Sequence, residues 1–172
     1  MKFDILLPIK PYYAYLIMKG EKTVEVRKFL IKDPNFSGKF KCYVSKDKQS
    51  LNRIPEADRA EFEKNIGNVA FEFVKCGVMC EEALHMRHGL KDSCLTHEEL
   101  DNYGKDKPLY GYRVTALNVY DKPRAFGEFN KYIKCKRPCN FFIENICRSR
   151  ITCIDKEKVT RPPQNYIKIM EV

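Results

Sequence analysis

The spacing of hydrophobic and polar residues predicts a chain of short strands and helices. Apolar and polar side chains alternate, as in half-buried strands, over 3–9, 23–29, 39–45, 67–78, 109–120 and 165–172. Helices are expected at 11–19, 55–65, 81–88, 96–103 and 126–133. Thr96 followed three residues later by Glu99 predicts a capping box at the start of the helix 96–103. Polar residues, glycine and proline predict loops or turns at 47–52, 89–93 and 121–123. Strands mixed with short helices indicate an α+β domain.

Residues 20–27 (GEKTVEVR) bring an acid and two bases into one small area. On the predicted strand, Glu25 and Arg27 share a face with Thr23, and the two valines share the other face. Lys22 stands at the corner between this strand and the preceding helix. Lys22, Glu25 and Arg27 are therefore candidate site residues. The alternative is a solvated strand face with an ion pair, because charged residues are common on exposed strands.

Two further side chains extend this candidate site. Glu72 is the only acid in the apolar run 67–78, and a carboxylate buried without a partner is costly. Lys22 or Arg27 is the expected partner, and an exposed Glu72 at a sheet edge is the alternative. Tyr12, or its neighbour Tyr13, can stack on a base, although aromatic residues at helical spacing are more often part of the core.

The charge of the chain is unevenly distributed. The net charge is +9, and residues 131–168 hold 10 of the 32 Lys and Arg but 3 of the 23 Asp and Glu. Such a basic segment beside a nearly neutral remainder suggests a surface that contacts phosphate groups. A cationic surface that serves solubility is the alternative.

Composition limits the class of protein. With 172 residues and 44% hydrophobic residues, the chain is expected to fold as one domain with a sizeable core. No apolar run approaches the about 20 residues of a membrane-spanning helix, so no membrane association is expected. The N-terminal residues lack the plan of a signal peptide. A cytoplasmic location is therefore expected, and the 8 cysteines are expected to be reduced thiols or metal ligands.

Half of the cysteines fall within one short segment. Cys135, Cys139, Cys147 and Cys153 are spaced C-x3-C-x7-C-x5-C. Four thiolates can close a tetrahedral structural zinc site, which would stabilise a basic segment that has few core residues of its own. The alternative is four independent thiols, since free cysteine is often buried.

Four motifs resemble the ASCH domain, a member of the PUA-like group of RNA-associated folds. They are 5–11 (ILLPIKP) with 20–27 (GEKTVEVR), 67–73 (GNVAFEF), 94–100 (CLTHEEL) with 107–112 (KPLYGY) and 121–123 (DKP), and 161–166 (RPPQNY). The last resembles the ends of longer, phage-type members. The resemblance implies a small curved β-barrel flanked by helices. One domain would comprise 1–130 and 160–172, with 131–159 as a basic cysteine-containing insertion.

The resemblance implies binding of RNA, a nucleotide or a modified nucleoside in a cleft lined by Lys22, Glu25, Arg27 and Glu72. The alternative is an enzyme, either a hydrolase of acylated modified cytidine or a ribonuclease. Members with the amidohydrolase activity use a Lys, a Thr and a Glu. Lys22 matches that Lys, Glu25 stands in place of the Thr, and Glu72 is the candidate acid. A third alternative is a protein-interaction accessory of a mobile element.

Overall fold

A computed structural model describes residues 3–32, 36–134 and 154–170. The strands are β1 (Asp4–Ile9), β2 (Val24–Arg27), β3 (Phe40–Val44), β4 (Val69–Met79), β5 (Tyr110–Arg124), β6 (Asn130–Lys134), β7 (Ile154–Lys158) and β8 (Ile167–Met170). The helices are α1 (Pro11–Met18), α2 (Lys48–Asn52), α3 (Glu56–Phe62), α4 (Glu81–His85), α5 (Arg87–Ser93) and α6 (His97–Gly104). Two short 3-10 helices are η1 (Glu63–Asn65) and η2 (Phe126–Glu128). The α+β class is confirmed.

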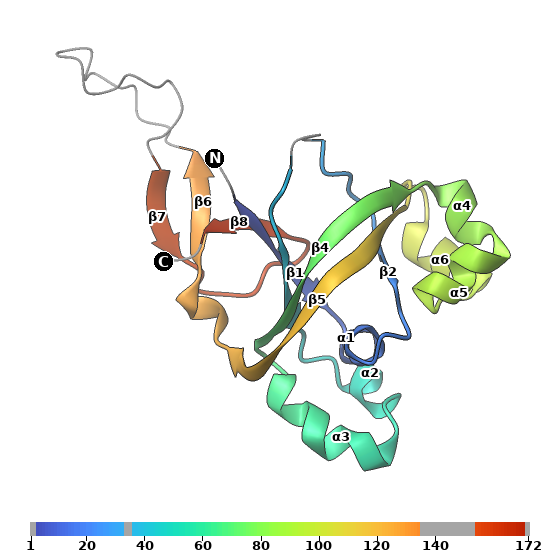
Figure 1. The fold of residues 1–172 in the computed structure, drawn as a ribbon, viewed down its shortest axis with the longest axis horizontal. Coiled ribbons are helices and arrows are strands. Elements are labelled where there is room, and N and C mark those ends of the chain that lie inside the picture. Colours follow the sequence, from blue (N-terminus) through green and yellow to red (C-terminus); the bar gives the residue numbers. More distant parts are fainter. Residues whose placement is uncertain (1–2, 33–35, 135–153, 171–172) are drawn as a thin grey trace.

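The strands form one sheet in the order β2-β5-β4-β3-β1-β8-β6-β7. β1 runs parallel to β3, and the other described pairs are antiparallel. The expected closed barrel is wrong, because closure requires pairing of the two end strands. Here β2 and β7 are the ends of an open sheet, and the β6–β7 pair extends away from β2 (Figure 1).

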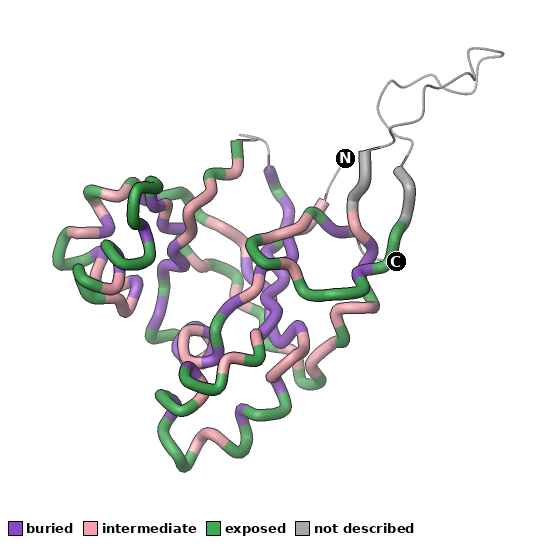
Figure 2. The backbone as a smooth tube through the Cα atoms, turned by 180° about the vertical axis from the view of Figure 1, so that it is seen from behind, coloured by how far each residue is buried: buried purple, intermediate pink, exposed green. Residues whose placement is uncertain are grey.

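The core is centred on β1, β3 and β4. Ile5, Leu7 and Ile9 point into the main hydrophobic cluster, whereas Leu6 enters a second cluster on the other face. β1 is thus buried on both sides, as expected for a central strand with a parallel neighbour. Phe40 and Phe73 lie opposite each other on β3 and β4, with their ring centroids 4.8 Å apart. Buried positions follow these central strands in Figure 2.

Helices α4, α5 and α6 form a separate cap at the β2 end of the sheet (Figure 1). Their apolar side chains join a third cluster, made of Val24, Val26, Met79, Leu84, Leu100 and Leu109. The start of α6 has the expected capping box, in which Thr96 accepts from Glu99 N and Glu99 accepts from Thr96 N. This cap brings α5 and α6 next to the strand that carries the predicted site.

Four local expectations are wrong. Residues 48–52 form α2, because the Asp47 side chain accepts a hydrogen bond from Ser50 N and caps a helix. Residues 89–93 belong to α5, and β5 continues through the expected turn at 121–123. The expected helix at 126–133 is the short η2 followed by β6. α2 thus forms through a local cap, whereas β5 and β6 are extended by pairing with neighbouring strands.

The basic segment contributes strands to the sheet. β6 pairs with both β7 and β8, and Phe129 and Val159 at its base are buried. The four cysteines of the predicted zinc site, Cys135, Cys139, Cys147 and Cys153, lie outside the described residues. In the part of the chain that is described, no helix has the length and apolar character that crossing a membrane requires.

Candidate functional site

The turn after α1 places Lys22 just before β2. Gly20 has a φ of 77°, a conformation that glycine adopts without strain. Its N–H donates to Ile17 O at 2.9 Å, and Lys22 N donates to Leu16 O at 3.1 Å. The backbone therefore reverses tightly at the helix end, and the Lys22 side chain is directed toward the neighbouring β2 side chains.

Lys22, Glu25 and Arg27 form one buried charged cluster. Lys22 Nζ lies 3.6 Å from Glu25 Oε2, and Arg27 Nη2 lies 2.8 Å from Glu25 Oε1. Lys22 and Glu25 are 2% and 5% exposed, so the alternative of a solvated strand face is wrong. The predicted convergence of one acid and two bases is present in the structure.

Backbone carbonyl groups hold both cations in place. Lys22 Nζ donates to Ser93 O at 2.5 Å, which joins the segment before β2 to the end of α5. Arg27 Nη2 donates to Pro8 O at 2.5 Å, which joins β2 to β1. Arg27 Nε is buried and has no hydrogen-bond partner among the described residues. A buried donor without a partner is costly, so this N–H is available to an acceptor on a ligand.

Burial changes the acid–base behaviour of Lys22. Desolvation lowers the pKa of the ammonium group below its ordinary value, and the nearby Glu25 carboxylate opposes this effect in part. The Tyr13 ring lies 5.3 Å from Lys22 Nζ and adds a cation–π contact. Lys22 consequently gives up a proton more readily than a lysine in water.

These side chains line a cavity of about 340 Å³, which we call the Lys22 cleft. It lies between the end of β1, the helix α1, β2 and the helix α6. Its lining residues are Pro8, Ile9, Lys10, Tyr13, Lys22, Glu25, Val26, Arg27, Leu95, Glu99, Asn102 and Tyr103. The cleft thus combines apolar walls and aromatic rings with a few converging charged groups, as in many small-molecule sites.

A second polar cluster joins α1 to α6 at the edge of this cleft. Tyr13 OH donates to Glu99 Oε1 at 3.3 Å, and Arg53 Nη1 donates to Tyr13 OH at 3.2 Å. Arg53 also lies 3.4 Å from Glu99. Burial raises the pKa of Tyr13, so its hydroxyl stays protonated. The sequence predicts only the helix-capping role of Glu99, because its contact with Tyr13 depends on the packing of α1 against α6.

The predicted aromatic residue Tyr12 does not line the Lys22 cleft. Its ring lies beneath the Arg53 guanidinium, whose central carbon is 4.1 Å from the ring centroid, and its N–H donates to Ser50 Oγ. Tyr13, named as the neighbouring possibility, lines the cleft instead. Asn102 and Tyr103 line it too and were missed, since a polar helix face carries no distinctive sequence signal.

The expectation that Glu72 pairs with Lys22 or Arg27 is wrong. Lys41 stands opposite Glu72 in the β3–β4 register, and Lys41 Nζ lies 2.7 Å from Glu72 Oε2. Lys39 Nζ lies 2.5 Å from Oε1, and Tyr120 OH donates to Oε2 at 2.7 Å. Glu72 is 5% exposed but does not line the Lys22 cleft. Burial favours a raised pKa, but the hydrogen bonds from Lys39, Lys41 and Tyr120 lower it to about 2.

Among residues 3–32, 36–134 and 154–170, no group of three or more His, Cys, Asp or Glu side chains is arranged to hold a metal ion. The cysteines of this part, Cys42, Cys76, Cys80 and Cys94, are free thiols. The groups that the Lys22 cleft presents to a ligand are ammonium, guanidinium, carboxylate and phenol groups.

Comparison with solved structures identifies the class of fold. A serine-to-alanine variant of the ASCH protein from Zymomonas mobilis matches with a TM-score of 0.52 and 16% sequence identity, over 71% of this chain and 73% of that chain. The unsubstituted protein of that organism matches with a TM-score of 0.48 and 16% identity, over 95% of this chain and 85% of that chain. No family model and no curated protein matches the sequence.

The chain thus has an α+β fold that is similar to these structures. More particularly, it has the fold of an ASCH domain. The ASCH fold expected from the sequence is confirmed, and the likeness to longer phage-type members stays a prediction.

Proposed function

We propose that this protein binds RNA or a nucleotide-derived ligand in the Lys22 cleft. The observation that carries the proposal is the buried Lys22–Glu25–Arg27 cluster in the wall of a cavity of about 340 Å³. That volume lies at the small end of the range for ligand pockets, roughly 300–1,000 Å³. It suits one unstacked nucleoside, which is how single-stranded RNA is commonly recognised.

Each group in the cleft has a suitable partner on a nucleotide. The unpartnered Arg27 Nε can donate to a base carbonyl or ring nitrogen. Glu25 can accept from an exocyclic amine, as carboxylates do with cytosine N4. The Tyr13 and Tyr103 rings offer faces for stacking. Lys10 is 63% exposed and can attract phosphate.

The proposal is tested by measuring the binding of short single-stranded RNAs and nucleosides. We expect Lys22→Ala to weaken binding at least tenfold, because it removes the ammonium and leaves Glu25 partly unpaired. Affinity for RNA should fall as salt rises. Lys48→Ala, which changes an exposed lysine on α2, is the matched control and should bind normally. The proposal would be contradicted if the affinity for RNA changed neither with the salt concentration nor in the Lys22→Ala variant.

The second candidate function is hydrolysis of an acylated modified nucleoside or of RNA. Burial lowers the pKa of Lys22, and the Glu25 carboxylate lies 3.6 Å from its Nζ. A lysine that releases its proton more readily, held beside a carboxylate, can pass a proton to or from a reacting group. Glu25 stands where the resemblance places a threonine nucleophile, so a mechanism here would use an activated water. Glu72 forms ion pairs with Lys39 and Lys41 instead, so we do not propose it as the catalytic acid of this hydrolysis.

Product analysis by mass spectrometry separates binding from catalysis. The protein and its Lys22→Ala variant are incubated with acylated cytidines and short RNAs. A product that forms with the parent protein and is lost in the variant supports the hydrolase. If no product forms, and the parent protein retains the substrate whereas Lys22→Ala does not, the result supports the binding function.

We also propose that Cys135, Cys139, Cys147 and Cys153 bind one structural zinc ion. The proposal rests on their spacing in the sequence. Protein purified without chelator is expected to contain about one zinc per chain. Serine at Cys139 should abolish the zinc content, whereas serine at the exposed Cys76 should leave it unchanged. Elemental analysis that finds no zinc in the parent protein would rule the site out.

A further inference from the structure

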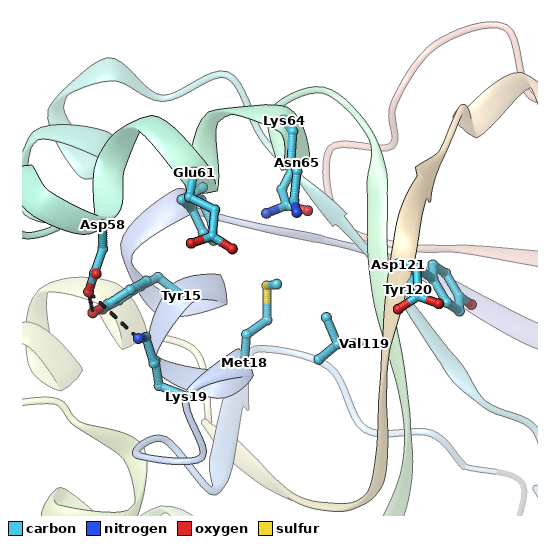
Figure 3. A pocket seen from close by; sticks show the side chains of 11 residues that line it. Tyr15, Met18, Lys19, Asp58, Glu61, Lys64, Asn65, Val119, Tyr120 and Asp121 are labelled. Atoms are coloured by element: carbon cyan, nitrogen blue, oxygen red, sulfur yellow. Dashed lines mark hydrogen bonds and ion pairs between the residues drawn. The ribbon is translucent and has the colours of Figure 1, made fainter.

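A second cavity lies on a different part of the molecule, between α1, the α3–η1 segment and β5 (Figure 3). Its volume is about 370 Å³. Asn65 lies at one wall, Met18 and Val119 lie across from it, and Tyr15 and Tyr120 flank the two sides. We call it the Asn65 cavity. None of its lining residues lines the Lys22 cleft.

Asn65 provides the first indication of a ligand. The residue is 2% exposed, and its side chain points from η1 toward the cavity (Figure 3). Its Oδ1 atom is buried and has no hydrogen-bond donor among the described residues. Leaving a buried acceptor without a donor is costly. A ligand with an N–H group directed at this oxygen would remove that cost.

Tyr15 and Tyr120 flank the cavity, and their hydroxyl groups are bound to neighbouring side chains. Tyr15 OH donates its proton to the Asp58 carboxylate, and Tyr120 OH donates to Glu72 at 2.7 Å. The Asp58 hydrogen bond raises the pKa of Tyr15 to about 12, and burial raises the pKa of Tyr120, so both stay protonated. The Tyr120 hydroxyl also has a hydrogen bond with Lys41, so the two tyrosines contribute side walls rather than free polar groups to the cavity.

Charge at the rim also favours a donor-rich ligand. Glu61 and Asp121 are exposed carboxylates of the lining and have no ion-pair partner within the described ranges. Asp58 is matched by Lys19, whose Nζ lies 3.7 Å from it. Lys64 is the remaining cation, so negative charge predominates at the rim. This small excess of negative charge favours a cationic ligand over a phosphate at the rim.

We infer that the Asn65 cavity binds a small organic cation, an alkyl amine or guanidinium whose N–H groups meet these oxygens. The deepest N–H donates to Asn65 Oδ1, and the cationic end lies between Glu61 and Asp121. The short apolar body packs against Met18, Phe62 and Val119. This inference does not depend on the function proposed for the Lys22 cleft.

Agmatine, which carries an amine and a guanidinium on a four-carbon chain, is the probe. Titration calorimetry is expected to give a dissociation constant in the millimolar range or tighter, typical of so small a ligand. Glu61→Gln combined with Asp121→Asn should weaken binding at least tenfold. Glu56→Gln, at an exposed carboxylate on the same helix α3, should leave it unchanged.

Asn65→Leu distinguishes a ligand contact from a structural role. Leucine has a similar size and removes the unpaired acceptor, so the melting temperature should be unchanged or higher. Agmatine binding should nevertheless fall at least tenfold. If Asn65→Leu unfolds the protein, the variant that combines Glu61→Gln with Asp121→Asn decides the question, because it changes only exposed side chains.

Two further controls complete the test. Lys22→Ala should retain agmatine binding, which separates this cavity from the Lys22 cleft. Pentane-1,5-diol, a neutral chain of similar length, should bind at least tenfold more weakly than agmatine. The inference is overturned if the parent protein does not bind agmatine, if the rim double variant binds it equally well, or if the neutral diol binds as tightly.

Discussion

Replacing Glu72 with alanine is expected to lower the free energy of unfolding by about 3–5 kcal/mol. Glu72 is almost fully buried and is bound by Lys39, Lys41, and Tyr120. Its removal leaves Lys41, which is 2% exposed, with Asp4 at 3.6 Å as its nearest remaining acid. Urea unfolding of the parent protein and the variant measures the difference.

A matched control and a pH series sharpen this prediction. Glu157→Ala removes an exposed carboxylate that pairs with Lys131 at 2.9 Å, and it should cost less than about 1 kcal/mol.

The pKa of Glu72 is lowered from 4.5 to about 2 in the folded protein. Its contribution to stability is therefore complete above the unfolded pKa, and it is lost as the pH falls from about 4.5 toward 2. The gap between parent and Glu72→Ala should shrink over that range, and a gap that widens there would contradict the assignment.

Replacing Gly89 with alanine is expected to destabilise the protein by about 2–3 kcal/mol. An added Cβ would lie 2.2 Å from Ala83 O and 2.7 Å from Leu84 Cα, and both are backbone atoms of α4 that cannot move independently. Gly127→Ala is the matched control, because its Cβ would meet the nearest atom, Val159 O, at 3.8 Å. Thermal unfolding of both variants gives the comparison. Equal melting temperatures for Gly89→Ala and Gly127→Ala would refute the close approach of Gly89 to the backbone of α4.

Gly89 also bears on the Lys22 cleft. Displacing α5 from α4 would move Ser93, whose carbonyl accepts the Lys22 hydrogen bond. We therefore expect Gly89→Ala to weaken ligand binding in the Lys22 cleft even at temperatures where the variant is fully folded. Gly127→Ala should bind normally.

The Lys22–Glu25–Arg27 cluster could be predicted from the sequence because it arises from local geometry. Alternation along a strand puts Glu25 and Arg27 on one face, and a glycine at the helix end puts Lys22 beside them. The partner of Glu72 could not be predicted in the same way. It is decided by the β3–β4 register, which sets Lys41 opposite Glu72 and depends on the packing of whole strands.

The fold shows the same division between local and distant determinants. The capping box at Thr96 follows from residues three apart, and it appears as expected. The open ends of the sheet could not be predicted from the alternation of apolar and polar residues, because this alternation identifies strands but not their pairing partners. The pairing of β6 with β8 likewise joins the basic segment to the sheet through residues far away in the chain.

The position of β1 has a consequence for synthesis of the chain. One edge of β1 is covered by β3, but the other is covered by β8, close to the opposite end of the sequence. At roughly 5–20 residues per second, the ribosome takes on the order of 10–30 s between producing these two strands. During that time a hydrophobic strand edge has no partner and is open to pairing with other chains. The nascent protein is therefore expected to need protection by chaperones until translation reaches β8.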